Sequence, residues 1–254
     1  MATGNPKYKV TQKEALQVAM AAKGCGEIRN VLDRVYTNSR ISTRHMAVPD
    51  FTPSQRDPND ELFFPLDNSY SLPVQVRLEK YKEVAVPLVT DVCKRAIAQA
   101  GVSLDSIHKL VVVSSTGFLG PSLDCELIKN LNLPRSTDRS LIGFMGCAAA
   151  MNGYRIAMDY VKAHPGKNAL MVCVEISSVH TTFKDNINDA ILHAIFADGA
   201  AACVLTAKEA SKIPKGTLAI VDDHVSIHRY TATPKVLLVC CYYYYYYYYA
   251  HRAG

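Results

Sequence analysis

The stretch Leu141-Ile142-Gly143-Phe144-Met145-Gly146-Cys147-Ala148-Ala149-Ala150-Met151-Asn152-Gly153 joins a short apolar run, a glycine-rich turn and the start of an amphipathic segment. This order predicts a strand, a tight turn and a helix. Cys147 then stands at the N-terminus of the helix, where unpaired backbone N–H groups and the helix dipole favour a thiolate. Glycine before the cysteine and alanine after it leave room for a substrate. We therefore interpret Cys147 as a candidate nucleophile rather than as a core cysteine.

Length and composition indicate a globular chain. The 254 residues, 49% of them hydrophobic, suffice for one large domain or two small ones. Twenty-eight basic and 23 acidic residues give a net charge of +5 without a Lys/Arg run, which argues against a nucleic-acid surface. Residues 1–10 lack the apolar core of a signal peptide, and no stretch is apolar enough to span a membrane. The eight cysteines form no C-x-x-C pair, so we expect no metal site and a reducing, cytoplasmic location.

Apolar periodicity predicts alternating helices and strands. Thr11 and Glu14 form a capping-box pattern, so we expect the first helix to begin there and run to about Ala22. The further helices expected are 27–37, 72–100 with a kink at Pro87, 122–131, 148–163 and 187–195. The strands expected are 110–114, 140–144, 169–176, 200–205 and 217–222. This order indicates the α/β class, with a mixed or mostly parallel sheet covered by helices.

Two polar segments are candidates for ligand contact. Ser115-Thr116-Gly117 follows the apolar strand 110–114, where open α/β sheets place ligands, although turn chemistry explains these residues about as well. The basic cluster 40–45 leads into 48–68, a segment rich in proline and in Asp/Asn pairs that we expect to be a surface loop. Contact with a ligand phosphate and a solvated basic face both fit this cluster, and the solvated face is the commoner case.

Several segments together resemble one enzyme family. They are residues 112–117, 143–153, 174–178 and 196–202. The chain resembles the type III polyketide synthases, the chalcone-synthase-like condensing enzymes, over about residues 11–224. The pattern is more similar to the bacterial and brown-algal branch than to the plant chalcone synthases.

The resemblance implies a thiolase fold, in which two similar α/β halves pack together and the protein forms a homodimer. It also implies that Cys147 accepts an acyl group from an acyl-CoA as a thioester. Malonyl-CoA would then lose CO2, and its enolate would attack that thioester. Repetition and cyclisation would give an aromatic polyketide of the phloroglucinol, resorcinol or pyrone type. Acyl-CoA and malonyl-CoA are substrates here, and no cofactor is implied.

The resemblance assigns roles to four further residues. Ser115 and Thr116 match pocket positions that shape the polyketide, and Phe183 matches a phenylalanine between the CoA tunnel and the cavity. The plant pattern places a Gly-Pro loop after that phenylalanine, whereas this chain continues with 184–187, and core packing explains a lone phenylalanine about equally well. Arg44 matches an arginine that contacts a CoA phosphate.

The family's catalytic histidine and asparagine lie in its second half, which by family spacing begins close to the end of this sequence. We therefore expect an N-terminal condensing-enzyme domain at residues 1–224 and a non-family tail at 225–254. Eight consecutive tyrosines, 242–249, fall in this tail, and a frame change or early stop is our hypothesis for them. The tail histidines His228 and His251 lack the flanking residues expected of the catalytic histidine.

Two other interpretations remain open from the sequence. One is a ketoacyl-carrier-protein synthase III-like enzyme, which shares the fold and the cysteine. The other is a truncated, non-catalytic partner of a full-length synthase. The Gly-x-x-Gly turn before Cys147 and the presence of Phe183 favour the polyketide synthase over the first alternative.

Overall fold

The computed structural model describes residues 1–54, 57–64 and 72–208, and its centre is a five-stranded sheet with the order β1-β7-β6-β4-β5. The strands are β1 (Ala2–Gly4), β4 (Ile107–Val113), β5 (Asp138–Ile142), β6 (Asn168–Ile176) and β7 (Asp198–Thr206). Strand β4 runs parallel to β5 and β6, whereas β7 pairs antiparallel with β6 and β1. The mixed sheet predicted from the sequence is thus confirmed. Residues 110–113 of β4 are all buried, which is expected of a strand that is covered on both faces.

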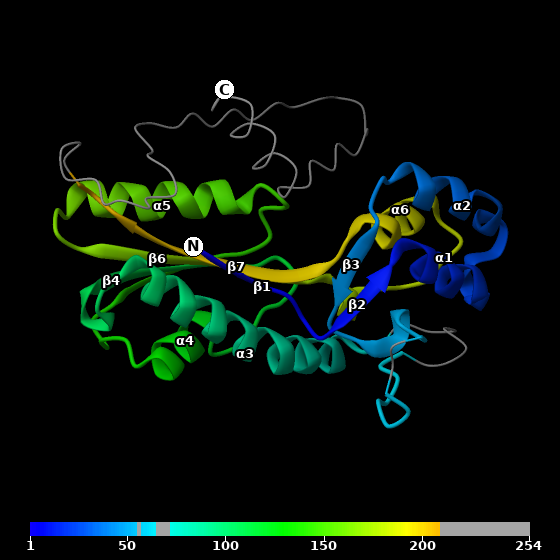
Figure 1. The fold of residues 1–254 in the computed structure, drawn as a ribbon, viewed down its shortest axis with the longest axis horizontal. Coiled ribbons are helices and arrows are strands. Elements are labelled where there is room, and N and C mark those ends of the chain that lie inside the picture. Colours follow the sequence, from blue (N-terminus) through cyan, green and yellow to red (C-terminus); the bar gives the residue numbers. More distant parts are fainter. Residues whose placement is uncertain (55–56, 65–71, 209–254) are drawn as a thin grey trace.

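Helices cover both faces of the sheet (Figure 1). Helix α5 (Ala149–Ala163) lies on one face, and α3 (Val74–Ala100) and α4 (Leu123–Leu131) lie on the other. Gly153 lets α5 approach the sheet closely, because a Cβ added there would stand 2.7 Å from Cγ2 of Val113. Helix α3 passes through Pro87 as one uninterrupted element.

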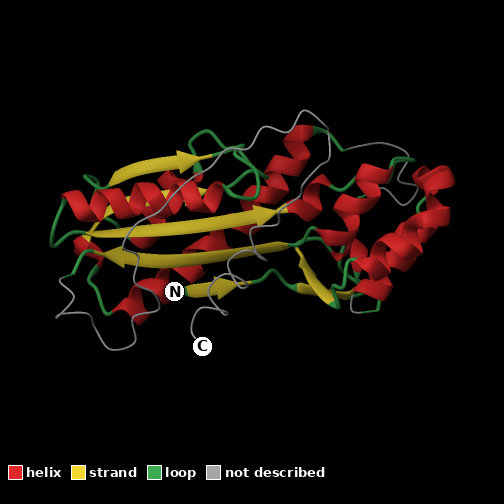
Figure 2. Cartoon of the chain, turned by 90° about the horizontal axis from the view of Figure 1, so that it is seen from above, coloured by secondary structure: helices red, strands yellow, loops and turns green. Residues whose placement is uncertain are grey.

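The remaining helices gather at one end of the sheet, beside a second, two-stranded antiparallel sheet (Figures 1 and 2). They are α1 (Gln12–Ala21), α2 (Arg29–Asn38) and α6 (Ile187–Ile195), and the strands of the small sheet are β2 (Tyr8–Thr11) and β3 (Thr43–Met46). Short 3-10 helices occupy Lys23–Ile28, Pro49–Phe51, Leu104–Ser106 and Ser177–His180. The capping box at Thr11 and Glu14 is confirmed, with the Thr11 Oγ1 accepting from the Glu14 N–H at 3.1 Å.

The structure departs from the sequence predictions at the N-terminal end. Strands β1, β2 and β3 are absent from those predictions because they are short and partly polar, so no alternating pattern marks them. The expected surface position of the basic cluster 40–45 is wrong for its last part, since β3 pairs with β2 there and Arg44 is buried. The expected strand 217–222, the boundary at 224 and the tail 225–254 lie outside the described residues.

In the described part of the chain, no helix combines the length and apolar character needed to cross a membrane.

Candidate active site

The carboxyl ends of β4, β5 and β6 meet at one edge of the sheet. Because the strands run parallel, Val113 at the end of β4 pairs with both Ile142 and Cys173. The Ser114 N–H donates to the Ile142 carbonyl at 3.1 Å, which joins the loop after β4 to the loop after β5. This register brings the hydroxyl segment after β4 to the same edge as the turn that carries Cys147, as the sequence predicts for a ligand-binding edge.

Cys147 lies directly before Ala148, the N-cap residue of α5. The turn before it is formed by two residues with left-handed backbone, Phe144 at φ +56° and Gly146 at φ +74°. Glycine adopts this conformation at no steric cost, whereas phenylalanine does so rarely. The Cys147 side chain is half-buried. The predicted strand, turn and helix around Cys147 are therefore confirmed, and the thiol stands at the open start of a 15-residue helix.

Glu175 on β6 holds the loop after β4. Its carboxylate accepts from the N–H groups of Ser115 and Thr116, each at 2.9 Å, and from the Thr116 hydroxyl at 2.6 Å. The Thr116 Oγ1 in turn accepts from the Ile176 N–H at 2.8 Å. Burial raises the pKa of Glu175, and these hydrogen bonds oppose that rise. The Ser115 hydroxyl is buried, and among the described residues it has no hydrogen-bond partner.

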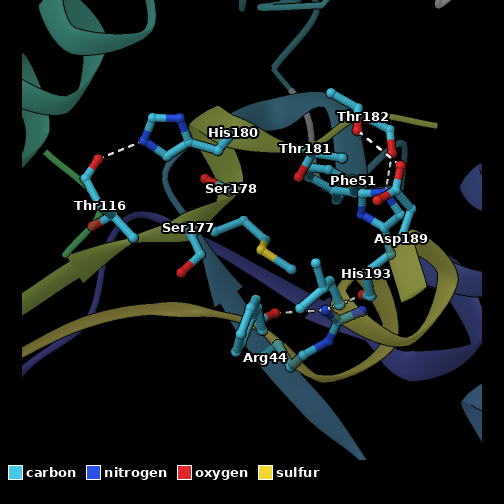
Figure 3. Close-up of a pocket in the computed structure, with 13 residues that line it drawn as sticks. Arg44, Phe51, Thr116, Ser177, Ser178, His180, Thr181, Thr182, Asp189 and His193 are labelled. Carbon is cyan, nitrogen blue, oxygen red and sulfur yellow. Dashed lines mark hydrogen bonds between the residues drawn. The ribbon is translucent and has the colours of Figure 1, made fainter. Parts of the chain in front are cut away.

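A cavity of about 180 Å³ opens between these loops and α6 (Figure 3). Thr116, Ser177 and His180 line it from the carboxyl ends of β4 and β6. Arg44 lines it from β3, and Phe196 lines it from the turn before β7. Of the residues predicted for the site, Thr116 and Arg44 thus form its wall. Cys147 and Ser115 lie on the neighbouring loops and do not belong to the described wall.

Two histidines of the wall were not proposed from the sequence. The His180 ring hydrogen-bonds the Thr116 carbonyl through Nε2, and the His193 ring hydrogen-bonds the Thr182 carbonyl. Burial lowers the pKa of both imidazoles below the ordinary value, so both are neutral at pH 7. The sequence held only a weak signal for His180, namely its place shortly after a buried strand.

Arg44 is 5% exposed, and its described hydrogen bonds go to protein atoms. It donates to the Gln12 side chain at 3.0 Å and to the carbonyls of His193 and Phe196 at 2.6 Å each. Burial lowers the pKa of Arg44 from its ordinary value. The contact with a CoA phosphate that the resemblance implies stays a prediction at this point.

The structure places Phe196, rather than Phe183, in the cavity wall. Phe183 is buried, its ring stacks on His193 with centroids 4.9 Å apart, and it lies 6.3 Å from the ring of Phe51. These contacts fit the core-packing alternative for Phe183. In the sequence, Phe196 is only part of the segment before β7, because an aromatic residue shortly before an Asp-Gly pair carries no signal of its own.

Comparison with known proteins places this geometry in a family. Residues 1–209 match the family described as chalcone and stilbene synthases, N-terminal domain. The chain is 41% identical over 210 residues to the alpha-pyrone synthesis polyketide synthase-like protein Pks18 of Mycobacterium tuberculosis, covering 82% of this chain and 51% of that protein.

Two solved structures show the same fold. PKS-I from the brown alga Ectocarpus siliculosus is 67% identical with a TM-score of 0.83, over 88% of this chain and 59% of that one. The 1,3,6,8-tetrahydroxynaphthalene synthase of Streptomyces coelicolor is 26% identical with a TM-score of 0.69, over 81% and 55% of the two chains. The chain thus spans a little over half of each of these structures and has the N-terminal half of their thiolase-like fold. It therefore belongs to the chalcone and stilbene synthase family, the type III polyketide synthases.

Proposed function

We propose that Cys147 accepts the acyl group of an acyl-CoA, as the first step of a decarboxylative condensation with malonyl-CoA. The observation that carries this proposal is the position of Cys147, half-buried and directly before the N-cap of α5 at the edge of the sheet. A helix start offers N–H groups without an intrahelical partner. Such groups can stabilise the oxyanion that forms when a nucleophile attacks or releases an acyl thioester.

The atoms and charges of the proposed reaction are all accounted for without a bound cofactor. The Cys147 sulfur attacks the thioester carbonyl, a carbon–sulfur bond forms, and CoA leaves as a thiol after taking up a proton. Malonyl-CoA then loses CO2, and its enolate carbon attacks the acyl-cysteine carbonyl. A carbon–carbon bond forms and the Cys147 thiolate is released. Because this chain spans about half the length of its relatives, we propose acyl loading for this chain and condensation for a protein that also carries the second half.

We propose an aromatic polyketide or pyrone as the product class. The name of the relative Pks18 supports a pyrone, and the uncharged hydrogen-bonding groups of the cavity wall support a chain of ketone and enol groups. Uncharged hydrogen-bonding groups are offered by Thr116, Ser177 and the two neutral histidines. Such groups suit the carbonyl oxygens of a polyketide better than they suit a charged ligand group. The family match also favours this reaction over the ketoacyl-carrier-protein synthase III-like alternative.

A second copy of this chain is the proposed protein partner, and the cytoplasm is the proposed location. Phe118 and Phe144 are 56% and 73% exposed with their rings 6.1 Å apart, and Leu141 on the edge strand β5 is 49% exposed. Exposed apolar residues beside an unpaired strand edge commonly mark a protein interface. Size-exclusion measurement of the chain alone tests self-association. The same measurement on a mixture with a full-length synthase tests the hypothesis of a non-catalytic partner, because a chain that never co-elutes with the synthase is not its partner.

Intact-mass analysis after incubation with acetyl-CoA tests acyl loading directly. We expect the parent chain to gain one acetyl group and the Cys147→Ala variant to gain none. Cys125→Ala serves as the matched control, because Cys125 is also a partly exposed thiol at the start of a helix, and this variant should load like the parent. Equal labelling of Cys147→Ala and the parent would overturn the proposal.

A further inference from the structure

We propose that Arg44 is a positioning residue, which caps the C-terminal end of α6 and so fixes the cavity wall, instead of binding a CoA phosphate. The proposal concerns the structural origin of the cavity, and only its activity test rests on the proposed function. The Arg44 guanidinium already donates hydrogen bonds to three protein oxygen atoms, at distances of 2.6 to 3.0 Å.

The last carbonyls of a helix have no intrahelical donor and need another partner. In α6 the Leu192 carbonyl accepts from the Phe196 N–H. The carbonyls of His193 and Ala194 have no backbone donor among the described residues. Arg44 Nη1 donates to the His193 carbonyl, and Gln12 Nε2 donates to the Ala194 carbonyl at 2.6 Å. A positive charge at this end of a helix is also favoured by the helix dipole. Arg44 and Gln12 therefore provide the cap of α6 from a strand and a helix far away in the sequence.

Gln12 and Arg44 act as one unit. The Gln12 Oε1 accepts from Arg44 Nε at 3.0 Å, while its Nε2 also donates to Ser39 Oγ at 2.8 Å. Gln12 is itself the first residue of α1, directly after the N-cap Thr11. The guanidinium is thus held in one orientation by α1 on one side and by the end of α6 on the other.

This arrangement leaves only the Nη2 atom of Arg44 to offer an external anion. The Tyr36 ring lies beside the guanidinium, 5.9 Å from its central carbon, and Nη2 is buried without a hydrogen-bond partner among the described residues. Nε and Nη1 are already bonded to protein oxygens. A phosphate that bonded Nε or Nη1 would therefore have to displace buried hydrogen bonds, which is costly when no other donor replaces them, and only Nη2 could contact it without that loss.

The two carbonyls that Arg44 bonds belong to residues of the cavity wall. His193 and Phe196 both line the cavity, and the same Nη1 atom of Arg44 bonds the carbonyls of both (Figure 3). Release of Arg44 frees the last turn of α6 and with it both rings. We infer that Arg44 sets the width of this side of the cavity, and through it the size of acyl group that the site accepts.

Hydrogen exchange tests the positioning role without any assay of activity. We expect Arg44→Met to speed amide exchange in residues 190–199 about tenfold or more relative to the parent, because capping bonds to a charged donor are lost. Exchange in α4, on the other side of the sheet, should stay unchanged. Arg34→Met is the matched control, since Arg34 is an exposed arginine of α2. Unchanged exchange at residues 190–199 in Arg44→Met would overturn the proposal even if acyl loading were never observed.

Acyl loading then separates positioning from phosphate binding. Rates of Cys147 acylation are measured with acetyl and hexanoyl groups, each carried by CoA and by N-acetylcysteamine, which has no phosphate. We expect Arg44→Met and Arg44→Lys to slow loading from both carriers by the same factor, about tenfold, and to change the acetyl-to-hexanoyl ratio. A lysine keeps the charge but lacks the planar fork that reaches several acceptors. Slowing confined to the CoA carrier, with rescue by Arg44→Lys, would show phosphate binding and refute the proposal.

Discussion

Glu175 accepts two hydrogen bonds from Thr116, one from its backbone N–H at 2.9 Å and one from its hydroxyl at 2.6 Å. A single carboxylate on β6 therefore fixes both the main chain and the side chain of a cavity residue that follows β4. An amide in the same place would turn an NH2 group towards donors that need an acceptor. This carboxylate therefore holds the loop after β4 together with the Ser114–Ile142 backbone hydrogen bond.

Replacement of Glu175 by glutamine should destabilise the chain by about 1–3 kcal/mol, because a buried donor of the 114–117 loop loses its acceptor. Urea denaturation of the parent and the variant measures the difference. Glu27→Gln is the control, since Glu27 is exposed and its substitution should change the free energy of unfolding little. A loss no larger than that of the control would show that the carboxylate does not hold the loop.

Asp198 should make stability depend on pH. Burial raises the pKa of Asp198 to about 6, against the partial opposition of hydrogen bonds from Ser178 and Ala47. Between pH 4 and 6, Asp198 therefore keeps a proton in the native state that it has released in the unfolded state. This difference adds to the free energy of unfolding. The contribution is fully present below pH 4 and is lost as the pH rises through 6. The expected loss is about 3 kcal/mol, from a shift of about two units.

Denaturation at a series of pH values checks this expectation. The Asp198→Asn variant should lose this part of the pH slope, whatever its absolute stability, whereas Asp33→Asn on the exposed face of α2 should keep it. Parallel curves for the parent and Asp198→Asn between pH 4 and 6 would contradict the prediction.

Gly153→Ala should destabilise the chain, although alanine normally favours a helix over glycine by about 1 kcal/mol. The added methyl group would meet Val113 Cγ2 at 2.7 Å and Met171 Cε at 3.0 Å, so α5 must move away from the sheet. Overpacking of this kind costs about 1–3 kcal/mol. Thermal unfolding measures the net effect. Gly120→Ala is the comparison, because the space around Gly120 is open and the added methyl group meets nothing within 4 Å.

Thiol labelling should separate Cys147 and Cys125 from the cysteines whose thiol pKa is raised by burial. Burial raises the pKa of Cys203 to about 11 and that of Cys93 further still, and Cys93 is fully enclosed. Brief treatment of the native chain with iodoacetamide at pH 7 should therefore modify Cys147 and Cys125 and leave Cys93 and Cys203 unmodified. Peptide mapping by mass spectrometry reads out each site, and the urea-denatured chain should label at all of them. Protection of Cys147 in the native chain would remove the basis for its role as nucleophile.

The central sheet could be predicted from sequence because its signals are local. Strands β4 and β6 are buried apolar runs flanked by turns, and the Thr11 capping box marks the start of α1. The Cys147 turn could also be predicted, since two glycines permit a tight turn and the alanines after Cys147 favour a helix. These elements follow from periodicity and turn chemistry within a few residues.

The cavity wall depends on contacts that no local pattern records. Arg44 lies in a basic cluster that fits a solvated face, yet its hydrogen bonds reach residues 149 and 152 positions away. Phe183 and Phe196 look alike in sequence, and only the packing against Phe51 and His193 assigns Phe183 to the core. Which phenylalanine faces a cavity is decided by how α6 is docked, and docking is a property of the whole fold.

The pairing of Ala2 with Ala202 has a consequence for synthesis of the chain. Strand β1 hydrogen-bonds only to β7 within the described sheet, so β1 must wait after its synthesis for a partner translated about two hundred codons later. Until then the N-terminal segment has no place in the sheet, and the outermost strand is among the last to join the native structure.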